Sequence, residues 1–231
     1  MTQSTTRHQT ASPSAPAAAP ASPSAPASPS GPASPSGPSA SAAGSASPSA
    51  ADPLSAFLGA VALAVATLDA VRPDQYDLPT PCEEYDVREL ARHVVAVLRR
   101  FALVGRGGDP MTLPHVADGS WHEAADEARA AWTADPGLLD RPVTLPFGTL
   151  PGAAALVVYA GEFTVHTWDV AVATGQSPAW DPAVLAASLG AMERALPAER
   201  RGEGVPFGPV VETAPDAPAV DRLVAWYGRR P

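Results

Sequence analysis

The sequence predicts an all-α protein whose core is an antiparallel four-helix bundle, and three observations predict this class. Apolar residues recur at three- and four-residue steps over several long segments, which is the spacing of one face of an α-helix. Residues that favour N-cap positions precede most of these segments, and proline or glycine follows them. Long helices with such connections pack as antiparallel neighbours around a shared core.

The first two helices are defined by apolar periodicity and by their boundary residues. The first is predicted over residues 54–71, and Pro73 closes it. The second is predicted over residues 87–104, where Asp86 is the N-cap and Glu89 follows three residues later, the spacing of a capping box. Glycines that follow this segment end the second helix.

A third helix is predicted over residues 120–136, because Ser120 and Glu123 repeat the spacing of a capping box. The next stretch, residues 141–152, is too rich in proline and glycine for a helix. We interpret it as a loop or a short extended excursion.

The fourth predicted helix covers residues 151–174 and ends at Gly175, a residue suited to a helix C-terminus. A fifth helix is predicted over residues 181–196, since an Asp-Pro pair supplies its N-cap and its first helical residue. A short amphipathic helix over residues 217–228 closes the bundle.

Composition divides the chain into two parts. From residue 11 to residue 50 nearly every residue is Ala, Ser, Pro or Gly, and a hexad recurs as ASPSAP or ASPSGP. Such side chains bury too little apolar surface to offset the entropy of ordering, so we expect residues 1–50 to form a disordered tail. Residues 51–231 are sufficient for one domain with its own core.

The charge balance and the hydropathy pattern exclude several function classes. The chain has 15 Arg, no Lys and 24 acidic residues, a net charge of −9 without a basic cluster, which argues against nucleic-acid binding. No apolar run reaches the roughly 18 residues of a membrane span, and no signal peptide is recognisable. We expect a cytoplasmic protein that binds neither nucleic acid nor a membrane; the sequence leaves its oligomeric state open.

The fourth predicted helix carries acidic and imidazole groups on a face that is otherwise apolar. Glu162 and His166 are four residues apart, so both side chains project from one side of the helix. His93 falls at the edge of the apolar face of the second helix. Two neutral imidazoles and one carboxylate are the ligand set of an open zinc site, in which water or substrate takes the fourth position. One interpretation of the pattern is therefore a metal site.

The competing interpretation is structural, since a Glu and a His four residues apart are common on helix surfaces. Apolar neighbours such as Leu156 and Phe163 favour a buried position, where a divalent cation would offset the cost of a lone carboxylate. Asp169 lies three residues after His166 and could be a fourth ligand. We favour its interpretation as an acceptor for an imidazole N–H or as the partner of an arginine.

Other reactive residues receive simpler interpretations. Cys82 is the only cysteine, so the chain cannot form an internal disulfide or a cysteine-rich zinc site. We interpret it as a packed structural residue, because the adjacent Glu83 and Glu84 would raise its thiol pKa. His115 and His122 are interpreted as surface histidines. No glycine-rich phosphate loop, serine-centred elbow or HExxH motif is present.

Three segments occur in the order of a known family: LPTPCEEYDVRELARHVV, GEFTVHTWDVAVATGQ and FGPVVETAPDAPAVDRLVAWYGRRP. Together they resemble the actinobacterial mycothiol-dependent maleylpyruvate isomerase-like metal-binding family, within the DinB-like four-helix bundles. The resemblance runs from about residue 51 to the C-terminus. It implies a divalent metal, usually zinc, held by His93, Glu162 and His166, with mycothiol as cosubstrate.

The function implied is a mycothiol-dependent thiol transferase or isomerase, in which the metal activates the thiol for attack on an electrophile. Its partners would be a small-molecule thiol and an electrophilic substrate, and no side chain is required to act as a general acid. A non-catalytic metal-binding sensor or interaction bundle is the alternative. A third possibility is a purely structural bundle in which Glu162 and His166 pair with each other and with an arginine.

Overall fold

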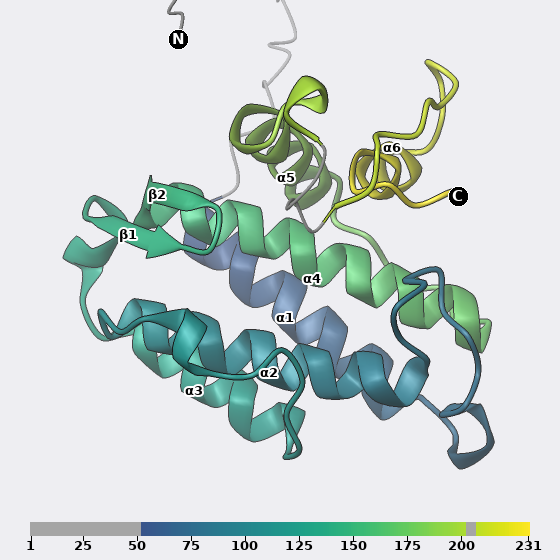
Figure 1. The fold of residues 1–231 in the computed structure, drawn as a ribbon, viewed down its shortest axis with the longest axis horizontal. Coiled ribbons are helices and arrows are strands. Elements are labelled where there is room, and N and C mark those ends of the chain that lie inside the picture. Colours follow the sequence, from purple (N-terminus) through teal and green to yellow (C-terminus); the bar gives the residue numbers. More distant parts are fainter. Residues whose placement is uncertain (1–51, 202–206) are drawn as a thin grey trace, which may run out of the picture. The chain divides into compact units, whose positions relative to one another are not determined.

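The computed structural model describes residues 52–201 and 207–231, and the predicted disordered tail lies outside them. The described residues are mostly helical, as predicted (Figure 1). Their helices are α1 (Pro53–Asp69), α2 (Val87–Gly105), α3 (Trp121–Thr133), α4 (Gly152–Thr174), α5 (Pro182–Ala195) and α6 (Ala219–Trp226). Each of the six predicted helices is therefore present, with ends within three residues of the predicted ones.

Helix starts follow the predicted caps. The Asp86 carboxylate accepts a hydrogen bond from the backbone N–H of Glu89 at 2.8 Å, so α2 begins where the capping spacing placed it. The Ser120 hydroxyl accepts in the same way at the start of α3, and Asp181 does so at the start of α5. At the end of α4, Gly175 adopts the left-handed conformation with φ of 72°.

The proline- and glycine-rich stretch forms a small hairpin. Strands β1 (Pro142–Leu145) and β2 (Gly148–Pro151) pair antiparallel, with Val143 opposite Leu150. Alternate residues of β1 are buried, so the hairpin packs one face against the helices. The predicted short extended excursion is therefore confirmed. The antiparallel pairing of its two strands was not predicted.

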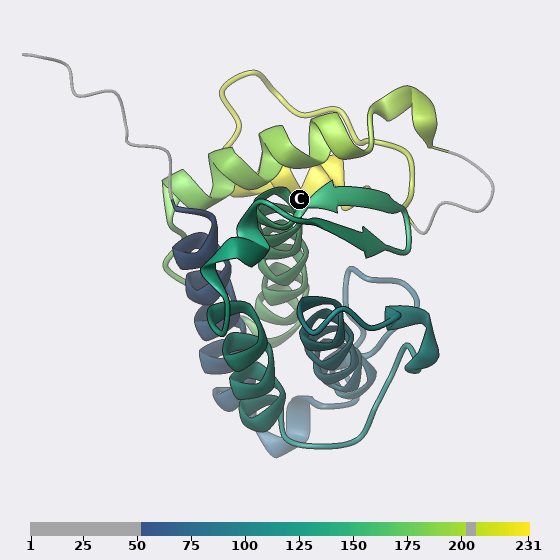
Figure 2. The same ribbon diagram turned by 90° about the vertical axis from the view of Figure 1, so that its left-hand side faces the viewer.

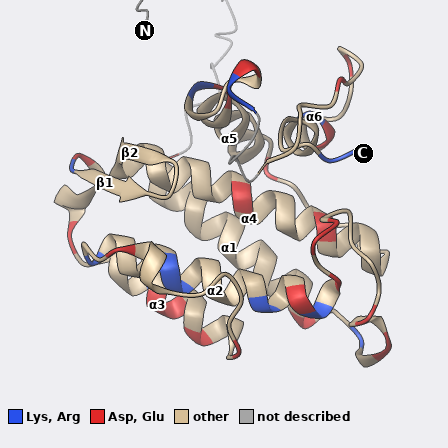
Figure 3. Cartoon of the chain, viewed as in Figure 1, with Lys and Arg blue, Asp and Glu red and all other residues tan. Residues whose placement is uncertain are grey.

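Two pairs of helices build the main core. α1 lies along α4 and α2 lies along α3, whereas α2 and α4 contact each other less closely (Figures 1 and 2). Phe57, Phe101 and Phe163 meet in the middle, with ring centroids 5.1 Å apart for the first two and 5.9 Å for Phe57 and Phe163. α1 carries almost no charge (Figure 3), and its buried residues form the face that packs against α4 and α3.

A second apolar cluster joins α5 and α6 to the outer side of α4. Trp168 belongs to it and is a core residue. Gly161 permits the close approach, since a Cβ there would lie 2.8 Å from the Tyr227 hydroxyl and 3.1 Å from Ser188 Cβ. The segment after α6 therefore lies against α4, next to the candidate metal ligands on that helix.

Within the described part of the chain, no helix is both long enough and apolar enough to cross a membrane.

Candidate metal centre

The structure brings His93, Glu162 and His166 together. One ligand atom from each side chain lies within 4.8 Å of the ligand atoms of the other two. His93 comes from α2, and the other two come from neighbouring turns of α4. The two imidazole rings meet edge to face, with centroids 5.0 Å apart and planes at 81°. The three residues singled out from spacing thus converge in space, and their binding of a metal remains a prediction.

His93 is oriented by the backbone of the loop between α2 and α3. Its Nδ1 lies 2.7 Å from the carbonyl oxygen of His115, and a carbonyl can only accept, so Nδ1 carries the proton. The Nε2 lone pair is left available as a ligand. Tyr85 stacks on the same ring at a centroid distance of 4.9 Å, which further restricts its rotation.

His166 is oriented by a buried carboxylate. Its Nδ1 lies 3.2 Å from Asp169 Oδ2, and Asp169 is fully buried. Arg229, in the segment after α6, donates to both oxygens of Asp169, from Nε and Nη2 at 3.0 Å each. Asp169 therefore makes both contacts predicted for it, to an imidazole and to an arginine.

The electrostatics of these side chains suit a cation. Burial and then the neighbouring His166 lower the pKa of His93 to about 3, so its imidazole is neutral at pH 7. Burial raises the pKa of Glu162, and no described group donates a hydrogen bond to its carboxylate. A neutral imidazole is the state that binds a divalent metal, and a cation beside Glu162 would offset the cost of ionising its buried carboxyl group.

Asp169 differs from Glu162 although both are carboxylates on α4. Burial by itself would raise the pKa of Asp169, but the hydrogen bonds from His166 and Arg229 outweigh it, so that this pKa falls below its usual value. Asp169 is thus an ionised partner with its acceptor sites filled, and it supports His166 rather than competing for an ion.

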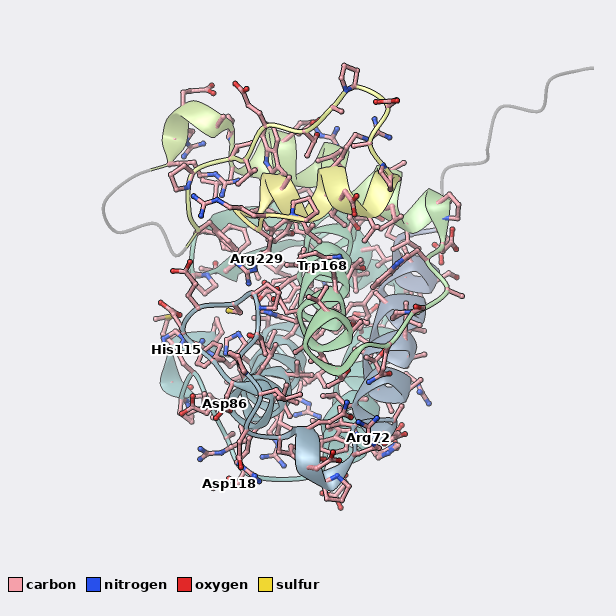
Figure 4. The ribbon with its side chains drawn as sticks, turned by 90° about the vertical axis from the view of Figure 1, so that its right-hand side faces the viewer. Arg72, Asp86, His115, Asp118, Trp168 and Arg229 are labelled. Atoms are coloured by element: carbon pink, nitrogen blue, oxygen red, sulfur yellow. The ribbon has the colours of Figure 1, made fainter. Side chains whose placement is uncertain are left out.

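A cavity of about 1060 Å³ opens beside the three candidate ligands. Its wall includes side chains from α2 and α4, from the loops on either side of α2, from the β-hairpin and from the C-terminal segment. Figure 4 shows His115 and Arg229 on the same side of the molecule, on two of these segments. The volume is that of a site for a small-molecule ligand.

Two residues of this region, His115 and Arg229, were missed or underestimated in the sequence. His115 is exposed, as predicted, but its carbonyl holds His93 and its Nδ1 accepts from Arg100 Nη1 at 3.0 Å. Arg229 gave no signal, because its partner lies sixty residues away on another element. His122 is an exposed residue that pairs with Asp69, as expected of a surface histidine.

Cys82 is buried and lines the cavity. Burial, more than the acidic neighbours, raises the pKa of its thiol, although Arg229 acts in the opposite direction. Its sulfur lies within 4.8 Å of ligand atoms of His166 and Asp169, a second group that could hold an ion. Because Arg229 already occupies both oxygens of Asp169, we favour the group with Glu162.

Comparison with known proteins supports the resemblance stated from the sequence. The profile of the mycothiol maleylpyruvate isomerase N-terminal domain matches residues 59–141. Two uncharacterized proteins of Mycobacterium tuberculosis, Rv0738 of strain H37Rv and MT0763 of strain CDC 1551, are each 34% identical over 181 residues. The aligned region is 77% of this chain and 98% of each relative. No solved structure matches.

The fold and the site therefore define a helical protein with a candidate metal centre. The chain belongs to the family of the mycothiol maleylpyruvate isomerase N-terminal domain. The matched residues include His93 but end before Glu162 and His166, so the geometry of α4 is what adds these two residues to the site.

Proposed function

We propose that this chain is a DinB-like four-helix bundle that binds one divalent metal, zinc, through His93, Glu162 and His166. The observation that carries the proposal is their convergence, with each imidazole held by its Nδ1 so that Nε2 is available. Two histidines that met by chance on a surface would not each have a hydrogen-bond partner that orients the ring. A cavity beside the ligands leaves a position for a further ligand.

We further propose that the protein is a mycothiol-dependent thiol transferase or isomerase. A zinc ion at this site would lower the pKa of a bound thiol, so that a nucleophilic thiolate forms at neutral pH. The chain's own residues bind and orient: the cavity wall holds thiol and electrophile, and the two histidines fix the ligand geometry. Membership in a mycothiol-associated family supports the choice of thiol.

The polar and apolar parts of the wall suit such a pair of substrates. Phe147 and Val97 offer apolar surface, whereas Glu84 and Arg230 lie in the same wall and suit hydroxyl-rich groups. We propose a small-molecule thiol and an electrophile as the partners, no nucleic acid or membrane as a ligand, and the cytoplasm as the location.

The test is thiol transfer from mycothiol to a panel of electrophiles, followed by adduct formation in the mass spectrum. We expect turnover by the wild type, loss of at least about 100-fold in His166→Ala, and similar loss after chelation, reversed by zinc. Asp118→Asn changes an exposed carboxylate away from the cavity and is the control. Zinc binding without turnover of any electrophile would favour the non-catalytic sensor.

A further inference from the structure

The structure describes two methionines, and they lie in opposite surroundings. Met111 belongs to a short 3₁₀ turn, Pro110–Thr112, in the loop between α2 and α3, and it is 56% exposed. Met192 lies on α5 and is 2% exposed. A thioether in contact with solvent is open to oxidation, whereas a buried one is protected. Met111 is therefore the methionine that an oxidant reaches, and Met192 provides an internal control.

The sulfur of Met111 accepts a hydrogen bond from Arg100 on α2. Its Sδ lies 3.4 Å from Nη2 of the guanidinium. The other N–H groups of Arg100 contact the same loop: Nε donates to the carbonyl of Pro110 at 2.8 Å, and Nη1 donates to His115 Nδ1 at 3.0 Å. One guanidinium therefore connects three positions of this loop to α2.

The three hydrogen bonds of Arg100 differ in strength. A thioether sulfur is a weak acceptor, whereas a carbonyl oxygen and an imidazole nitrogen are strong ones. Arg100 is 7% exposed, and within the described part of the chain no carboxylate lies within 4.0 Å of its guanidinium. A buried cation without an anionic partner gains most from a better acceptor. The contact with sulfur is thus the one that a change of acceptor would strengthen.

We propose that Met111 is a reversible oxidation site whose sulfoxide accepts a hydrogen bond from Arg100. The sulfoxide oxygen carries a partial negative charge and is a much stronger acceptor than the thioether sulfur. Rotation of the Met111 side chain brings this oxygen to Nη2 of Arg100. Because Met111 is exposed, its oxidation places no polar group in an apolar core, unlike oxidation of Met192. The modified side chain therefore fastens the loop to α2.

The fastened loop is part of the cavity wall. Pro110 and His115 line the cavity, and the His115 carbonyl accepts from His93 Nδ1 at 2.7 Å. This carbonyl is already in position, so oxidation of Met111 stiffens the wall without changing the candidate metal ligands. The site senses oxidants, and it does not depend on metal binding or on thiol transfer.

The chemistry balances with a peroxide as the oxidant. Sulfur uses one lone pair to form a bond to an oxygen of hydrogen peroxide, and the O–O bond breaks. The hydroxide that leaves takes the proton of the new S–OH group and becomes water. The thioether loses two electrons and the peroxide gains them. In the reverse step a dithiol supplies two electrons, becomes a disulfide, and the sulfoxide oxygen leaves as water.

The first experiment treats the full chain with hydrogen peroxide and follows both methionines by peptide mass spectrometry. We expect Met111 to be oxidised at least about tenfold faster than Met192, because of its exposure. Methionine sulfoxide reductases supplied with a dithiol should restore Met111. Equal oxidation rates at the two residues, or a sulfoxide that these enzymes do not reduce, would overturn a reversible site at Met111.

The second experiment tests the contact with Arg100 by thermal unfolding. A charge-assisted hydrogen bond in place of the contact with sulfur should raise the midpoint of the oxidised wild type by about 2–4 °C. Met111→Leu has a side chain of similar volume without sulfur, so peroxide should leave its midpoint unchanged. Met111→Gln supplies an amide oxygen as the acceptor, and its midpoint should match that of the oxidised wild type without peroxide.

Hydrogen exchange provides a local measurement of the same contact. The backbone amides of Thr112 and Leu113 donate to the carbonyls of Asp109 and Pro110 at 3.2 and 3.3 Å. Exchange of these amides should slow by about three- to tenfold when the wild type is oxidised, since the loop opens less often. Peroxide treatment of Met111→Leu should not change it.

A midpoint that is unchanged or lower in the oxidised wild type would overturn the contact with Arg100, and so would exchange that is not slowed. An equal shift in peroxide-treated Met111→Leu would assign the effect to another residue, such as Cys82, and would also overturn the site. None of these outcomes depends on metal content or on thiol transfer, so failure of this inference is distinguishable from failure of the proposed function.

Discussion

The two histidines of the candidate metal centre are oriented by different means. His93 donates to a backbone carbonyl in an exposed loop, whereas His166 faces a fully buried carboxylate that an arginine from the C-terminal segment also holds. The first arrangement needs no particular side chain at position 115, since every residue offers a carbonyl. The second depends on the identity of two side chains. Substitution of the residues that orient His166 on α4 should therefore weaken metal binding more than substitution of the residue that orients His93 on α2.

The largest expected effect is that of Asp169→Asn. The variant leaves Arg229 without its charge partner in a buried setting, so we expect the free energy of unfolding to fall by about 3–5 kcal/mol. The asparagine would keep one acceptor oxygen but would lose the negative charge and the second acceptor that serve His166 and Arg229, so zinc binding should weaken by about 10- to 100-fold. Urea unfolding and competition with a chromophoric chelator measure the two effects.

The control for this variant is Asp118→Asn. Asp118 pairs with Arg92 at 2.8 Å on the surface, where such pairs contribute about 0–1 kcal/mol. If Asp169→Asn bound zinc as tightly as this control, the buried carboxylate would have no role in orienting His166.

The two sides should also differ in their response to acid. The pKa of His93 is lowered from 6.5 to about 3, so between these values the unfolded chain binds the proton that the folded chain refuses. The free energy of unfolding of the metal-free protein therefore falls as the pH falls through this window. The pKa of Asp169 lies below 3.8, so its stabilising contribution is present above that value and is lost at lower pH.

Urea unfolding at a series of pH values separates the two windows. His93→Gln should flatten the profile between pH 6.5 and about 3, while Asp169→Asn should flatten it only below about pH 4. A His93→Gln profile parallel to that of the wild type would show that this imidazole is not kept neutral by burial.

A smaller effect is expected for Arg229→Lys. Lysine keeps the positive charge but cannot donate to both oxygens of Asp169 in the planar geometry of a guanidinium. We expect zinc affinity to fall by about three- to tenfold, less than in Asp169→Asn. Arg230→Lys, one residue further on, serves as the control, and an equal effect of both variants would show that the two hydrogen bonds from Arg229 to Asp169 are not the cause.

The smallest effect is expected for His115→Ala. The substitution removes the imidazole that accepts from Arg100 and retains the carbonyl that accepts from His93. Zinc affinity should stay within about twofold of the wild type in the same chelator competition. A loss as large as that of Asp169→Asn would mean that the loop conformation, through Arg100, controls His93.

Local sequence signals predicted most of the fold. The capping residues Asp86 and Ser120 and the terminal Gly175 fixed helix boundaries, because each acts on backbone groups within a few residues. The pairing of the hairpin strands was not predictable from Pro and Gly content, since those residues favour many kinds of turn.

The candidate site was predictable only in part. Glu162 and His166 were visible through helical spacing, and the apolar face of α2 pointed to His93. The roles of His115, Arg100 and Arg229 depend on contacts between segments distant in the chain, for which one sequence contains no local signal.

The most direct test is the metal content of the untagged protein, measured by elemental analysis beside His93→Ala and Glu162→Ala. The account predicts about one zinc per chain in the wild type and its loss in both variants, since each removes one of three protein ligands. A wild type that holds no metal after zinc is offered and the excess is removed would contradict the metal centre.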